Sequence, residues 1–79
     1  MADVTVRYWA GARAAAGRDD ERLQASSVAD VVLSLSARTP ALGPVLALSS
    51  LLVDGRVVRA DVSLADGQVV EVLPPFAGG

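Results

Sequence analysis

Apolar residues recur at every second position in the segment Val4–Trp9, which is rich in β-branched and aromatic residues. This period of two predicts a β-strand whose Val4, Val6 and Tyr8 side chains face the core. The same parity places Trp9, the only tryptophan, on the outer face beside polar neighbours. An exposed aromatic residue in such a position is a candidate for contact with a partner.

The segment Val69–Leu73 is apolar except at Glu71. Such a run is typical of a central strand, and we expect it to pair with the N-terminal strand. Val70 and Val72 share one face of this strand. Glu71 and Leu73 share the other face with Val69, and the carboxylate of Glu71 indicates that this face is at least partly exposed.

The main helix is predicted to begin at Ser27 and to end at Thr39-Pro40. Ser27 and Asp30 have the spacing of a capping box, and an acidic first turn suits the helix dipole. Apolar residues recur at helical spacing and give one stripe that can pack on a sheet. This stripe consists of Val28, Val31, Val32 and Leu35.

Shorter elements are predicted between these segments. Ala10–Ala16 is rich in alanine and should form a short helix with Gly17 as its C-cap. Glu21–Gln24 reads as a second strand that pairs with the first. Ala41–Pro44 is interpreted as a connector, and Val45–Leu48 as one further helical turn.

Asp54-Gly55 lies between the apolar strand Leu51–Val53 and a returning segment, Arg56–Arg59, which is a strong hairpin signal. Asp66-Gly67 should form another turn before the last strand, after a connection anchored by Leu64. The order strand, strand, helix, strand, strand, strand predicts an α+β fold of the β-grasp, ubiquitin-like type. One main helix would pack across a mixed sheet of four to five strands, and residues 1–79 would form a single domain.

The chain contains neither cysteine nor histidine, which excludes disulfides, thiolate nucleophiles, imidazole bases and the usual zinc sites. Its net charge of −2 and its scattered arginines argue against nucleic-acid binding. The acidic run Asp19–Glu21 is interpreted as a surface turn, so we expect no self-contained catalytic site and no metal site. We find no signal peptide and no apolar run of membrane-spanning length, and we expect a cytoplasmic protein.

The last six residues form a tail that directly follows the strand ending at Leu73. They are Pro74, Pro75, Phe76, Ala77, Gly78 and Gly79. The prolines cannot continue a sheet ladder and favour a stiff, extended exit from the fold. The two glycines lack a Cβ and fit a slot that no side chain could enter. The tail is expected to be flexible, although an ordinary frayed terminus is the alternative interpretation.

The carboxylate of Gly79 would be ionised at neutral pH and a poor electrophile, so it would need activation, for example by ATP-dependent adenylation. The Pro-Pro-x-x-Gly-Gly ending resembles that of the small subunit of molybdopterin synthase, a ubiquitin-like sulfur carrier. The resemblance covers essentially the whole chain. It includes the segment Val6–Ala10, Arg13 followed by Gly17, and the turn Leu64–Gly67.

The resemblance implies a β-grasp sulfur carrier that is not catalytic alone and binds no cofactor itself. An E1-like activating enzyme would adenylate Gly79 using ATP and Mg²⁺, and a persulfide donor would then supply the sulfur of a thiocarboxylate. The tail would insert into the large subunit of molybdopterin synthase, where the sulfur passes to a cyclic pterin precursor in molybdenum cofactor biosynthesis. The partner interface would be an apolar patch at Trp9, Val57 and Leu73.

Two turn residues depart from the family pattern. Gln68 stands where an acidic residue is frequent, and Asp54 where asparagine is common. Three alternatives remain open: a sulfur carrier for thiazole or cysteine synthesis, a protein modifier that forms isopeptide bonds through Gly79, and an interaction domain whose tail is incidental.

Overall fold

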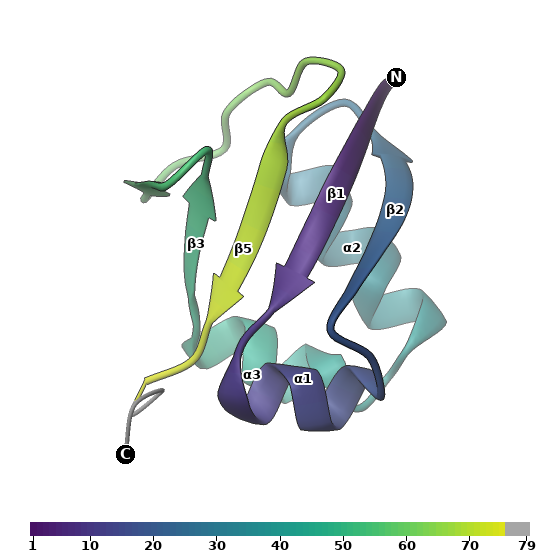
Figure 1. Ribbon diagram of the computed structural model, residues 1–79, viewed down its shortest axis with the longest axis vertical. Helices are drawn as coiled ribbons and strands as arrows, with labels where there is room; N and C mark the ends of the chain where they lie inside the picture. The colour runs from purple at the N-terminus through teal and green to yellow at the C-terminus, as the bar shows by residue number, and fades with distance from the viewer. Residues whose placement is uncertain (76–79) are drawn as a thin grey trace.

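The computed structural model describes residues 1–75. Its elements, in chain order, are β1 (Ala2–Tyr8), α1 (Ala10–Ala16), β2 (Asp20–Ala25), α2 (Val28–Arg38), α3 (Leu42–Leu48), β3 (Ser50–Val53), β4 (Arg56–Val58) and β5 (Val69–Leu73) (Figure 1). The predicted strands are all present, and so are the two predicted helices. Strand β1 begins two residues earlier than predicted and ends one residue earlier, because Trp9 already caps helix α1.

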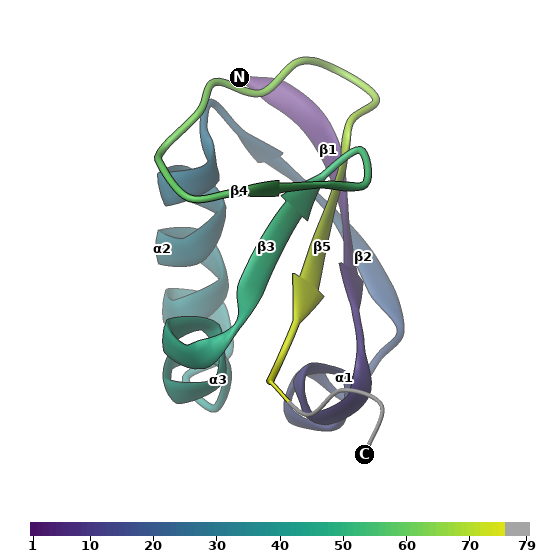
Figure 2. The ribbon, with the colours of Figure 1, turned by 90° about the vertical axis from the view of Figure 1, so that its left-hand side faces the viewer.

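The five strands form one mixed sheet in the order β2-β1-β5-β3-β4. Strands β1 and β5 are parallel, whereas the other neighbouring pairs are antiparallel. Helix α2 lies along one face of the sheet, and α1 and α3 lie at one end of it (Figure 2). The predicted β-grasp architecture is confirmed, with β5 in the central position expected from its apolar sequence.

The core lies between the sheet and α2, and its members follow the predicted parities. Val6, Val70 and Val72 are completely inaccessible to solvent, and Tyr8 is nearly so. They belong to one apolar cluster with Val31 and other residues of α2. The alternating side chains of β1 and β5 therefore separate into a core face and an outer face, as predicted.

The N-terminus of α2 is fixed from two directions. The Ser27 hydroxyl accepts a hydrogen bond of 3.3 Å from the Asp30 amide. The Asp30 carboxylate accepts one of 2.9 Å from the Ser26 amide, one residue earlier than in a standard capping box. The Asp61 carboxylate accepts a further bond of 2.9 Å from the Ala29 amide. The connection between β4 and β5 is thereby tied to the start of the helix.

Helix α3 corrects the interpretation of residues 41–44 as a connector. The helix begins at Leu42 and includes Pro44 in its first turn. A proline is tolerated there because the first amides of a helix have no intrahelical acceptor. Leu42 is completely buried and Leu46 is nearly so, so burial of an apolar stripe stabilises this short helix.

The Asp54-Gly55 turn is confirmed and has positive φ at both residues, 49° and 83°, as a type I′ turn requires. One oxygen of the Asp54 carboxylate accepts a hydrogen bond of 2.9 Å from the Val69 amide, and the other accepts one of 3.1 Å from Gln68 Nε2. The side-chain oxygen Oε1 of Gln68 in turn accepts a bond of 2.8 Å from the Ala65 amide. The two departures from the family pattern are therefore in direct contact.

The structure confirms the predicted strand at Glu21–Gln24 but contradicts the interpretation of residues 19–21 as a surface turn. Strand β2 begins at Asp20, and the Glu21 side chain is only 8% exposed. Its carboxylate accepts a hydrogen bond of 2.7 Å from the Tyr8 hydroxyl and lies 3.1 Å from a guanidinium nitrogen of Arg38. Burial raises the pKa of Tyr8 well above its ordinary value, and the bond to Glu21 adds to this effect. The carboxylate thus links β1, β2 and the end of α2.

Candidate docking surface and tail

Strand β5 carries the chain out of the middle of the sheet. It is hydrogen-bonded to β1 on one side and to β3 on the other, and it ends at Leu73. After β5 the chain leaves the sheet at the end where α1 and α3 lie (Figures 1 and 2). Pro74 is partly buried and Pro75 is exposed. The other tail residues predicted to matter, Phe76, Ala77, Gly78 and Gly79, lie outside the described residues.

The outer face of the sheet carries a row of side chains that crosses four strands. Arg7 is the register partner of Glu71, Glu71 of Leu52, and Leu52 of Val57. Val57 is 50% exposed, and Leu52 and Glu71 are partly exposed. Leu73 lies two residues beyond Glu71 on the same face and is also partly exposed.

Trp9 adjoins this row through two contacts with β5. Its backbone amide donates a hydrogen bond of 3.2 Å to the Val72 carbonyl. Its indole Nε1 donates one of 2.8 Å to Oε2 of Glu71. The side chain is nevertheless 41% exposed. The structure therefore places Trp9 next to the outer face of β5, close to the point where the chain leaves the sheet.

The three residues predicted for the interface thus lie on one surface, together with Leu52, which was not predicted. We define the outer-face patch as Trp9, Leu52, Val57 and Leu73. The sequence does indicate the position of Leu52, because the two-residue turn at Asp54-Gly55 fixes its pairing with Val57. The partner role of the patch remains a prediction.

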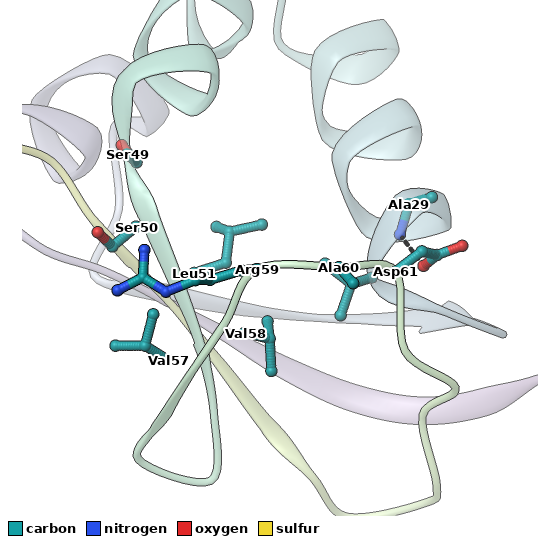
Figure 3. Close-up of a pocket in the computed structure, with 10 residues that line it drawn as sticks. Ala29, Ser49, Ser50, Leu51, Val57, Val58, Arg59, Ala60 and Asp61 are labelled. Atoms are coloured by element: carbon teal, nitrogen blue, oxygen red, sulfur yellow. Dashed lines mark hydrogen bonds between the residues drawn. The ribbon is translucent and has the colours of Figure 1, made fainter.

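A groove of about 430 Å³ lies beside the patch, between the start of α2 and the β3–β4 hairpin. Val57, Val58 and Leu51 contribute apolar walls, and Arg59 extends along it (Figure 3). The Asp61 carboxylate in this groove is already engaged by the Ala29 amide. The groove widens the apolar surface next to Val57, but its polar groups do not form a catalytic arrangement.

The chemistry offered by residues 1–75 is limited. No three carboxylates in this part of the chain gather closely enough to hold a metal ion. None of the helices formed by the described residues has both the length and the apolar character needed to cross a membrane. The features that stand out are an apolar surface with one carboxylate in it, and a proline-led exit next to that surface.

Comparison with known proteins identifies the family of this chain. The ThiS family model matches residues 6–79. A putative molybdopterin converting factor subunit 1 from Pyrococcus furiosus is 30% identical with a TM-score of 0.86, over 96% of this chain and 100% of that one. Small archaeal modifier protein 1 from Methanosarcina acetivorans is 31% identical with a TM-score of 0.88, over 100% of this chain and 98% of that one.

A complex of subunits 1 and 2 of the molybdopterin-converting factor from Helicobacter pylori contains a chain with the same fold. That chain is 19% identical with a TM-score of 0.76, over 98% of this chain and 99% of that one. None of the curated proteins is a significant match. The fold is that of the ubiquitin-like sulfur carriers and modifiers. Because the family model spans nearly the whole sequence, we conclude that this chain belongs to the ThiS family.

Proposed function

We propose that this chain is a sulfur carrier whose Gly79 carboxylate is adenylated and then converted to a thiocarboxylate. The observation that carries the proposal is the position of β5. A central strand, held on both sides, delivers Pro74 and Pro75 directly beside the outer-face patch. A partner that docks on the patch would therefore receive the tail at a defined point, and the prolines would lower the entropic cost of inserting it. The proposal requires Gly79 to carry a free α-carboxylate.

Adenylation would be the work of an E1-like enzyme that uses ATP and Mg²⁺. A carboxylate oxygen of Gly79 would attack the α-phosphorus of ATP and release pyrophosphate. The sulfur of a persulfide donor would then attack the acyl carbon, and AMP would leave. A thiol would attack the donor's sulfur in the resulting sulfur–sulfur bond, which releases the thiocarboxylate and leaves the thiol and the donor joined by a disulfide. This chain would supply the acyl group and the docking surface, which agrees with the limited chemistry of its described side chains. The enzymes and ATP that it needs make the cytoplasm its proposed location.

The proposed destination of the sulfur is a cyclic pterin precursor, within a molybdopterin synthase formed with a large subunit. The Pyrococcus furiosus relative is described as subunit 1 of a molybdopterin converting factor. The Helicobacter pylori structure is described as a complex of subunits 1 and 2. These relatives support the pathway and the large-subunit partner. The outer-face patch is the surface on which we place that partner.

A protein-modifier function is the second candidate, because the Methanosarcina acetivorans relative is described as a modifier protein. This chain has no lysine, so it could not form isopeptide-linked polymers of itself. A modifier would be recognised by conjugates to other proteins that survive reducing agent and hydroxylamine. A sulfur carrier would yield no such conjugates.

The deciding experiment is the intact mass of the purified chain after incubation with ATP, Mg²⁺, an E1-like enzyme, a persulfide donor and a thiol. We expect a gain equal to the difference between one sulfur and one oxygen atom. A variant that lacks Gly79 should fold normally and show no gain. A variant that lacks Met1 is a matched control, because it is shortened at the opposite end and should gain the same mass. Failure of the intact chain to gain mass with any activating enzyme would contradict the proposal.

A further inference from the structure

Glu71 is a carboxylate in the middle of an otherwise apolar surface. Its register partner on β3 is Leu52, and Leu73 follows two residues later on the same face. The side chain is partly buried. Oε2 accepts the hydrogen bond from Trp9, whereas Oε1 has no hydrogen-bond partner among residues 1–75. Among residues 1–75, therefore, one oxygen of this carboxylate is hydrogen-bonded and the other is left unpaired.

Arg7 is the nearest candidate for neutralising Glu71, because the two residues are register partners on β1 and β5. Their charged groups are nevertheless more than 4 Å apart, since the ion pairs within residues 1–75 are Arg13–Asp19 and Arg38–Glu21. The charge of Glu71 therefore has no direct counter-charge on the described part of the chain. A partner that covered this face with apolar groups alone would remove water from an unpaired carboxylate, which is strongly unfavourable.

We propose that Glu71 determines which partner the outer-face patch accepts, by selecting an apolar protein surface that places an arginine over it. The inference rests on the proposed function, because it assumes that the patch docks a partner. Arginine suits the site better than lysine. Its guanidinium is weakly hydrated, is enriched in protein interfaces and can stack on the exposed ring of Trp9 while donating to the carboxylate.

Three variants separate the charge of Glu71 from its contact with Trp9. E71Q removes the charge but keeps a carbonyl oxygen that can accept the hydrogen bond from Trp9. E71R places a like charge opposite the partner's arginine. D20N is the matched control, because it changes the net charge by the same amount as E71Q. Asp20 is exposed and is the register partner of Arg7 on β2, so it lies in the same row of the sheet as Glu71 but two strands away.

The test measures the affinity of each variant for two purified proteins encoded by the same genome as this chain: the large subunit of molybdopterin synthase and the E1-like activating enzyme. For at least one of them we expect E71Q to lower the affinity about tenfold or more, E71R to lower it further, and D20N to leave it unchanged. The affinity of the wild type should also fall more steeply with added salt than that of E71Q. Circular dichroism of each variant verifies the fold.

Three other results are possible, and each contradicts a different claim: the role of Glu71, the proposed function, or the identity of the partner. If E71Q binds both proteins as tightly as the wild type or more tightly, Glu71 does not select a cation, whereas the sulfur-carrier proposal is untouched. If the wild type binds neither protein and gains no mass in the thiocarboxylate assay, the proposed function is wrong and the inference falls with it. If sedimentation shows that the chain dimerises and that E71Q abolishes the dimer, the occupant of the patch is a second copy of this chain.

Discussion

The hydroxyl of Tyr8 donates a hydrogen bond of 2.7 Å to the carboxylate of Glu21. Tyr8 is 2% exposed, and the Glu21 side chain 8%. The same carboxylate pairs with Arg38 at 3.1 Å, so one polar cluster joins two strands to the end of α2. Clusters of this kind contribute to stability only when each member is satisfied. Removing one member therefore has consequences that depend on which groups are left behind.

Replacing Glu21 with alanine should lower the free energy of unfolding by about 1–3 kcal/mol, because it leaves the buried Tyr8 hydroxyl without an acceptor. Tyr8→Phe should cost less, about 1 kcal/mol, because Glu21 would keep its ion pair with Arg38. Urea denaturation measures both. Asp20→Ala, at the exposed neighbouring position, is the control and should change stability by at most about 0.5 kcal/mol. Equal effects of Glu21→Ala and Asp20→Ala would contradict the role given to the cluster.

The raised pKa of Tyr8 predicts a loss of stability at alkaline pH. Burial and the neighbouring Glu21 both disfavour the phenolate in the folded state. Because the pKa is higher in the folded chain than the ordinary value of 10.0, this contribution is fully present below pH 10 and is lost as the pH rises above it. The slope cannot exceed about 1.4 kcal/mol per pH unit from this one group.

Since Tyr8 is the only tyrosine, its ionisation can be followed directly by tyrosinate absorbance. We expect the absorbance to rise together with unfolding and not before it. Tyr8→Phe should remove most of the stability loss above pH 10. Ionisation of a fully folded chain near pH 10 would show that the hydroxyl is more accessible than the structure indicates.

The contact between Asp54 and Gln68 predicts that two harmful substitutions compensate each other. Asp54→Asn should place an NH₂ group against Nε2 of Gln68, so that two donors face each other. Rotation of the Gln68 side-chain amide by 180° would not help, because it would break the bond from the Ala65 amide. Gln68→Glu should place two carboxylates together. The double variant restores a donor opposite an acceptor and keeps an acceptor for Ala65. We expect a favourable coupling of about 0.5–3 kcal/mol in a double-mutant cycle of urea unfolding. Simple additivity would contradict it.

Trp9→Ala should weaken docking to the large synthase subunit by about tenfold or more, because exposed aromatic residues at the centre of an interface carry much of its binding energy. The fold should persist, since the Trp9 side chain makes no capping hydrogen bond to α1. Leu33→Ala is the matched control: Leu33 is 69% exposed but lies on helix α2. Isothermal titration calorimetry measures both. An equal loss of affinity in the two variants would mean that the outer-face patch is not the docking surface.

The sequence predicted the parts of this fold that depend on local periodicity. Alternation in β1 and β5 gave the correct core faces, since a strand has only two faces and one must be apolar here. The Asp54-Gly55 turn and the start of α2 were also predictable, because both depend on residues within a few positions of one another. The overall architecture followed from these elements, and relatives with the same fold confirm it.

The features that were misplaced or missed have different physical causes. Glu21 was expected on the surface because its partners are supplied by β1 and by the end of α2, which are distant in the sequence. Pro44 suggested a connector because a single sequence does not show whether a proline lies before a helix or within its first turn. Leu52 lies in a run of three apolar residues that has no alternation, so only the pairing with β4 reveals its face. The roles given to Gly79 and to the patch remain predictions.

The central place of β5 also determines how the chain responds to mechanical force. A pull on Pro74 acts along a strand that is bonded to β1 on one side and to β3 on the other. Ladder bonds on both sides of the strand resist this pull, whereas an edge strand would be held on one side only. Under the proposed function, the tail enters a partner and must later be withdrawn from it. Attachment of Pro74 to the middle of the sheet would then allow this withdrawal without unfolding of the domain.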